Sequence, residues 1–88
     1  MKINENFLLR EVAGRAVVVP VGDAADRFSG MIKLNETAAF IWHTLETDCE
    51  IADVVDALCK EYGVDKETAE RDVLALIGTL RKAGILDE

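Results

Sequence analysis

The sequence is poor in the residues that carry most catalytic and metal-binding chemistry. Its 88 residues include one histidine, two cysteines and one proline. Cys49 and Cys59 form no CxxC pair, and one histidine with two separated cysteines does not make a recognisable zinc site. Both cysteines are expected to behave as small apolar residues of a reduced protein. We therefore expect no metal and no cofactor.

Long apolar runs are missing as well. No stretch approaches the roughly 20 apolar residues of a membrane span, and the first residues lack the apolar run of a secretory signal. The sequence thus predicts a cytoplasmic protein without a membrane partner. Its 50% hydrophobic and 31% charged residues are typical of a globular chain, and residues 1–88 are expected to form one small domain.

No constellation of residues predicts an enzyme. His43 follows Trp42 on a predicted helix and is expected at the surface. No serine, cysteine or threonine stands in a GxSxG or phosphate-loop pattern. Six carboxylates fall where outer helix faces are predicted: Glu46, Asp53, Asp56, Glu61, Glu67 and Glu70. We interpret them as a solvated surface and not as an acid–base pair.

Charge is divided unevenly along the chain. Residues 1–34 carry five basic and four acidic side chains, a net of +1, and residues 35–88 carry five basic and thirteen acidic ones, a net of −8. The two parts sum to the formal net charge of −7. Nucleic-acid affinity depends largely on cations that neutralise phosphates, so the acidic part predicts no nucleic-acid partner.

The period of the hydrophobic pattern changes from two residues to 3.6 after Leu34. Before this point, β-rich runs predict strands over 7–12, 15–21 and 30–34, the first two joined as a hairpin. After it, helices are predicted over 35 to about 46, about 50 to 62, and 65 to 83. The predicted fold class is α+β: a three-stranded antiparallel sheet followed by three helices, in a winged helix-turn-helix-like arrangement.

The third predicted helix offers a candidate contact surface. Its core stripe is expected to comprise Ala69, Val73, Leu76 and Leu80, with Ile77 at the margin. Leu74 lies roughly 120° from the centre of that stripe and is expected to be exposed beside Gly78, with Arg71 and Arg81 nearby. This pattern predicts a shallow apolar slot flanked by cations. The alternative is that Leu74 packs on a neighbouring strand or on a second subunit.

The third predicted strand offers the other half of a site. It comprises Gly30, Met31, Ile32, Lys33 and Leu34. An edge strand presents unpaired N–H and C=O groups, so this strand, if it forms an edge beside the third helix, would accept an extended peptide as an added strand. The alternative is an edge that is too short and simply solvated.

Several short motifs resemble those of one protein family. The stretch 34–42, LNETAAFIW, resembles the LNxTAxxIW signature of PqqD-like proteins, and YGVD at 62–65, ERDV at 70–73 and LRKAGIL at 80–86 continue the pattern. The resemblance runs from about Phe7 to Asp87. Each motif is moderately specific, and their order and spacing together make the resemblance strong. The matching residues Asn35, Thr37, Trp42, Tyr62 and Asp72 are expected to be mainly structural.

The resemblance implies a non-catalytic peptide chaperone. Proteins of this family bind the leader of a ribosomally made precursor peptide as a strand added between the third strand and the third helix. They present the precursor to a modifying enzyme, often a radical SAM maturase, in the biosynthesis of pyrroloquinoline quinone (PQQ) or in a related cluster. On this chain the expected peptide-binding residues are Gly30, Met31, Ile32, Lys33, Leu34, Arg71, Leu74, Ala75, Gly78 and Arg81.

Two other functions stay open at this stage. An exposed edge strand and an apolar slot serve a homodimer, or docking to an enzyme, as readily as peptide capture. A winged-helix DNA-binding protein is the less favoured alternative, because acidic side chains on the second and third helices would face phosphates poorly.

Overall fold

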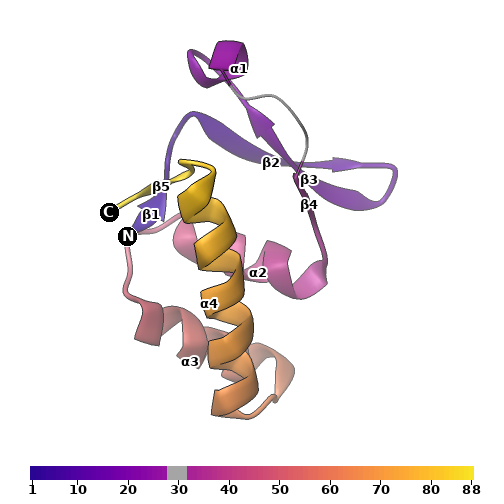
Figure 1. Cartoon of the computed structure of the whole chain (residues 1–88). Coiled ribbons are helices and arrows are strands. Elements are labelled where there is room, and N and C mark those ends of the chain that lie inside the picture. Colours follow the sequence, from indigo (N-terminus) through magenta and orange to yellow (C-terminus); the bar gives the residue numbers. More distant parts are fainter. Residues whose placement is uncertain (28–31) are drawn as a thin grey trace.

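The fold is described from a computed structural model, which describes residues 1–27 and 32–88. The strands are β1 (Lys2–Ile3), β2 (Phe7–Val12), β3 (Arg15–Pro20), β4 (Ile32–Leu34) and β5 (Leu86–Asp87). The helices are α1 (Ala24–Arg27), α2 (Glu36–Leu45), α3 (Ile51–Tyr62) and α4 (Lys66–Lys82). The predicted α+β class is confirmed, with an antiparallel three-stranded sheet ahead of the three longer helices (Figure 1).

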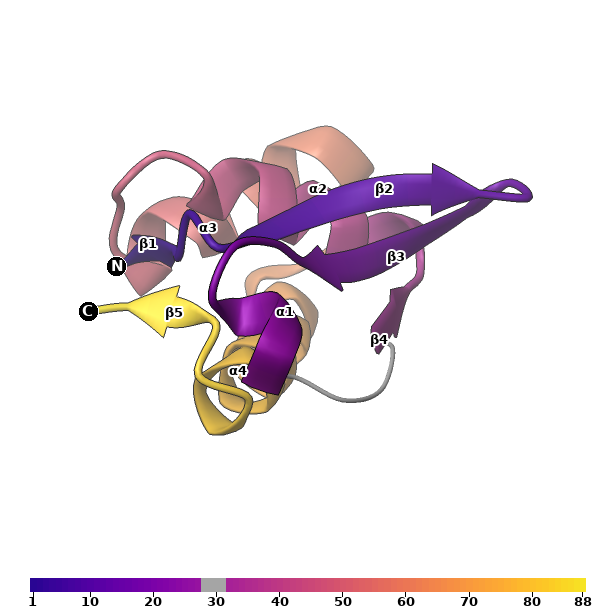
Figure 2. The same cartoon turned by 90° about the horizontal axis from the view of Figure 1, so that it is seen from above.

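The main sheet has the order β2-β3-β4, with both neighbouring pairs antiparallel. The β2–β3 hairpin turns at Ala13 and Gly14, whose φ angles of 52° and 78° lie in the left-handed region that a tight two-residue hairpin requires. Pro20 ends β3, where the N–H that it lacks interrupts no central ladder. The hairpin extends beyond the start of α2 (Figure 2).

The three longer helices begin and end at residues that the sequence marks. Asn35 caps α2, because its side-chain oxygen accepts the Ala38 N–H at 2.8 Å. Asp65 caps α4 in the same way, accepting the Thr68 N–H at 3.1 Å. Gly63 ends α3 with a φ of 66°. None of the helices in the described part of the chain has the length and apolar character needed to cross a membrane.

A second, two-stranded ribbon joins the ends of the described chain. β1 pairs with β5 in antiparallel register, Ile3 opposite Leu86. The sequence patterns predict neither strand of this ribbon nor the single turn of α1. Strands of two residues are too short to show the alternation that reveals longer strands.

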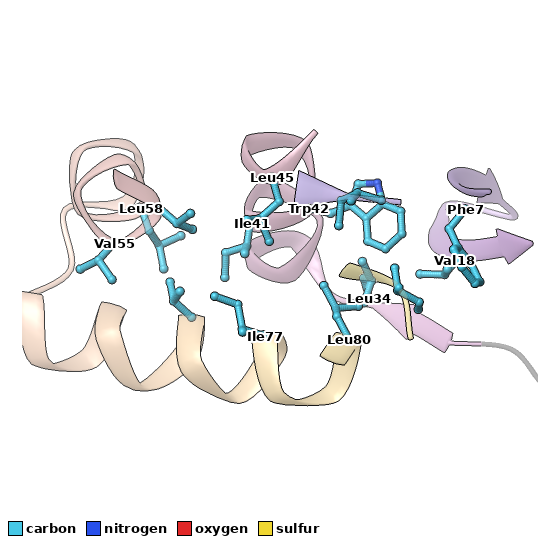
Figure 3. Close-up of a cluster of buried hydrophobic side chains, with 14 of the residues drawn as sticks. Phe7, Val18, Leu34, Ile41, Trp42, Leu45, Val55, Leu58, Ile77 and Leu80 are labelled. Carbon is cyan, nitrogen blue, oxygen red and sulfur yellow. The ribbon is translucent and has the colours of Figure 1, made fainter. Parts of the chain in front are cut away.

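One core cluster connects the sheet, the helices and the ribbon. Trp42 is fully buried near its centre, as predicted, between the α4 side chains and Phe7 and Val18 of the sheet (Figure 3). One detail of the predicted α4 stripe is wrong: Ile77 is buried at 1% exposure, whereas Leu76 is only half-buried. The stripe that faces the core is therefore rotated toward Ile77.

Candidate functional site

The candidate site begins at β4, which stands at one end of the main sheet. Among the described residues, β4 pairs with β3 alone. Leu34 is buried and points toward Leu80 of α4 (Figure 3), Ile32 packs partly against the core, and Lys33 is exposed. These contacts fix β4 against the helices by one face. The outer edge of β4 has no strand partner among the described residues, and such an edge presents unpaired N–H and C=O groups.

A groove lies beside the end of β4, between the start of α2 and the middle of α4. Its volume is about 310 Å³, and its α2 side is formed by Asn35, Thr37, Ala38 and Ile41. The α4 side is formed by Asp72, Ala75, Leu76 and Thr79. Asn35 directly follows the last residue of β4, so the groove begins next to the carboxyl end of this strand. Small side chains at Ala38 and Ala75 leave the floor accessible to a guest side chain.

The structure places one of the predicted α4 residues in this groove, namely Ala75. Leu74 is exposed at 46%, as the sequence predicted. At about 100° per residue, however, Leu74 lies roughly 150° round the helix from the centre of the four groove-lining α4 residues. The same projection places Arg81, like Leu74, on the side of α4 that faces away from the groove.

The remaining predicted residues are placed as follows. Arg71 and Gly78 lie on the solvent side of α4, between Leu74 and Ala75 on the projection. A Cβ added at Gly78 would meet no atom of residues 1–27 and 32–88 within 4 Å, so this part of the chain leaves the predicted slot beside Leu74 open. Arg81 is paired with Glu88, its Nε and Nη2 lying 2.8 and 2.6 Å from the two carboxylate oxygens. Gly30 and Met31 fall outside the described residues.

Sequence reasoning missed seven of the eight groove residues, because it treated most of them as core or cap. Thr37 donates its hydroxyl to the side chain of Asn35 at 3.1 Å, which supports the α2 cap. Asp72 is exposed at the groove rim, and Leu76 was assigned to the core. The signal that could have found them is the i, i+3, i+4, i+7 spacing of residues 72, 75, 76 and 79, which places them on one helix face.

The histidine and the two cysteines lie outside the groove. His43 is exposed and paired with Glu46 at 2.9 Å. Both cysteines are free, and burial raises the pKa of the Cys49 thiol, which disfavours the nucleophilic thiolate. No cluster that could hold a metal ion occurs in residues 1–27 and 32–88. The six carboxylates predicted to be solvated are all exposed.

Residues 8–86 match the family model described as Coenzyme PQQ synthesis protein D (PqqD). The chain belongs to the PqqD family. The match starts within β2 and ends within β5, so it includes both β4 and the groove. The PqqD-like residues that were expected to be structural largely are: Asn35 caps α2, Trp42 fills the core, and Tyr62 packs edge-on against Phe40 with ring centroids 5.6 Å apart.

Two solved structures resemble this PqqD-family chain over nearly its full length. One is described as TbiB1 in complex with the TbiA(beta) leader peptide; it is 26% identical, with a TM-score of 0.76, covering 99% of this chain and 95% of that one. The other is a lasso peptide synthetase B1 complexed with the leader peptide; it is 28% identical, with a TM-score of 0.72, covering 96% of this chain and 93% of that one. No curated protein is a significant match.

Proposed function

We propose that this protein is a non-catalytic, cytoplasmic peptide chaperone that binds the leader of a ribosomally made precursor peptide. The leader adds as a strand to the free edge of β4, and its side chains enter the groove between α2 and α4. The observation that carries the proposal is the position of β4, an edge strand with one described strand partner and a groove at its end. The leader peptides bound to both structural relatives support it.

Each part of the site contributes in a different way. Main-chain hydrogen bonds along β4 supply affinity for an extended peptide with little dependence on its sequence. The groove supplies specificity, because alternate side chains of an added strand point to the same face. Its size is that of one or two apolar side chains, and Asp72 and Thr79 at its rim favour a polar or cationic neighbour. The leader is therefore expected to carry a short apolar motif as its anchor.

The bound precursor is presented to a modifying enzyme, for which the proposal names a radical SAM maturase of PQQ biosynthesis or of a related cluster. The family description supports the PQQ assignment. The second structural relative is named for lasso peptide synthesis, which supports including related pathways beside PQQ biosynthesis. Genes for a short peptide and a radical SAM enzyme beside this one would favour the maturase, and a gene set without a radical SAM enzyme would contradict it.

A matched pair of variants tests the site. Ala75→Glu places a charge in the groove, and Leu74→Glu places the same charge one residue away, on the other side of α4. Calorimetric titration with the synthetic leader of the neighbouring precursor gene is expected to give at least about tenfold weaker binding for Ala75→Glu, because the carboxylate occupies part of the groove and loses hydration when a leader side chain enters. Leu74→Glu is expected to stay within about twofold of the wild type.

The two variants also distinguish a binding site in the groove from a binding site in the slot beside Leu74, which the sequence predicted. Both positions are exposed on the same helix, so circular dichroism should show the same helix content in both variants. Loss of binding in Leu74→Glu with normal binding in Ala75→Glu would move the site to the slot. Absence of leader binding by the wild type would contradict the proposed function itself.

A further inference from the structure

The face of the main sheet that points away from the helices has an unusual composition. Side chains opposite each other across an antiparallel pair share a face, and Phe7, Val18 and Leu34 belong to the core. The alternating residues therefore form the outer sheet face: Leu8, Arg10, Val12, Arg15, Val17, Val19 and Lys33. Four of these seven residues are aliphatic, three are cationic and none is acidic.

This outer sheet face is apolar and solvent-accessible. Leu8 and Val12 are 38% and 58% exposed, and within the described residues the other exposed large hydrophobic side chain is Leu74 on α4. Val17 is only 4% exposed although it stands outside the core cluster. Its cross-strand neighbours on this face are Arg10 and Lys33, whose aliphatic stems can cover it. Val17 at the centre of the face is thus covered, and the exposed aliphatic side chains are Leu8 and Val12, which stand on either side of Arg10 along β2.

The charge of this face is opposite to that of the rest of the molecule. Its three cations give +3, so with a total of −7 the remaining residues carry −10. An anionic lipid surface would attract three cations but repel the larger negative remainder. Exposed aliphatic side chains interspersed with cations fit instead an apolar protein surface that also carries carboxylates.

The outer sheet face also adjoins the edge at which the leader is proposed to bind. Lys33 belongs to β4 itself, so the outward side chains of an added strand would lie next to it and extend the same face. Seven residues are few beside the roughly 20–30 that each partner contributes to a stable interface. The face alone supports a weak contact, and the leader strand would enlarge it.

From these observations we infer that the outer sheet face is the docking surface for the modifying enzyme, through an apolar patch on that enzyme bordered by acidic residues. The inference rests on the proposed function, because the enzyme would contact the sheet and the added leader strand together. The leader should then raise the affinity for the enzyme. By thermodynamic reciprocity, the enzyme should raise the affinity for the leader by the same factor.

Two variants on the hairpin test this surface without touching the groove. Val12→Glu and Arg15→Glu each add negative charge to the outer sheet face at exposed positions near the hairpin turn. Binding of the purified modifying enzyme encoded beside the precursor gene is expected to fall about tenfold or more in each variant. Affinity for the leader alone should stay within about twofold of the wild type. Leu74→Glu, an equally drastic change on α4, should leave binding of the enzyme unchanged.

The outcomes distinguish this inference from the proposed function. Normal leader binding with unchanged enzyme affinity in both hairpin variants would overturn the docking surface and leave the proposed function standing. A concentration-dependent dimer of the wild type that both variants abolish would assign the face to a second copy instead. The enzyme should bind more tightly when the leader is saturating. Equal affinity with and without the leader would contradict a contact of the enzyme with the sheet and the leader strand together.

Discussion

Trp42 shows how one residue organises the centre of this molecule. Its side chain is fully buried between the sheet and α4, yet its indole N–H has no hydrogen-bond partner within the described structure. A buried donor without a partner costs about 1–3 kcal/mol. The tryptophan is therefore retained for its volume and apolar area. Its position in the family-like LNETAAFIW stretch reflects core packing and not peptide contact.

We expect Trp42→Ala to lower the free energy of unfolding by about 3–5 kcal/mol, because it leaves a large cavity at the centre of the core. Trp42→Phe should cost much less, since it keeps most of the volume and removes the unpaired donor. Urea unfolding followed by circular dichroism measures both. Equal losses in the two variants would show that the indole N–H has a stabilising partner.

At the scale of elements, helix α4 carries both the core and the candidate groove. Asp65 fixes its first turn, and the hydrogen bonds from the side chain and backbone of Thr68 hold the pKa of the Asp65 carboxyl below its usual value. A carboxyl whose pKa is lowered by folding stabilises the folded state above its unfolded pKa. That stability is lost as the pH falls through the lowered value.

Asp65→Asn should make the protein less sensitive to acid. Asparagine also caps helices but does not titrate. Between about pH 5 and pH 3 the melting temperature of the wild type should therefore fall further than that of the variant. The other carboxylates with lowered pKa values, Asp48 and Glu88, are present in both proteins, so their contributions cancel. Parallel pH profiles of the two melting temperatures would contradict this role of Asp65.

The elements were predictable from the sequence where the local signal is strong. The strands of the hairpin and the three longer helices have clear periods and caps, with Gly63 ending α3 and Asp65 capping α4. The β1–β5 ribbon was not predictable, because each strand has two residues and the partners lie more than 80 residues apart. The sequence predicted Leu76 in the core stripe and Ile77 at its margin, and the structure shows the reverse. Both residues lie near the border of the stripe, where the packing of neighbouring helices decides which side chain is buried.

The candidate site was predictable only in part. The sequence places β4 before the first long helix and gives the angular spacing of residues on α4. It does not say on which side of α4 the strand lies. The structure places Ala75, Asp72 and Thr79 in the groove between α2 and α4, with Leu74 and Arg81 outside it.

At the scale of the whole molecule, the helical part and the sheet present surfaces of different charge. The helical part is acidic, which opposes binding to nucleic acid. The sheet carries an apolar and cationic outer face on one side, and within the described residues its strand β4 pairs with β3 alone. These features would let one small protein hold a peptide at its edge and offer a neighbouring face to a second protein.

The most direct measurement is hydrogen exchange at the β4 amides with and without saturating leader peptide. If the leader adds to the sheet, outward-pointing amides within Ile32–Leu34 gain a partner and their exchange slows. The β1–β5 ribbon, which takes no part, should exchange as before. Exchange at Ile32–Leu34 that stays unchanged while calorimetry shows the leader bound would contradict strand addition at β4.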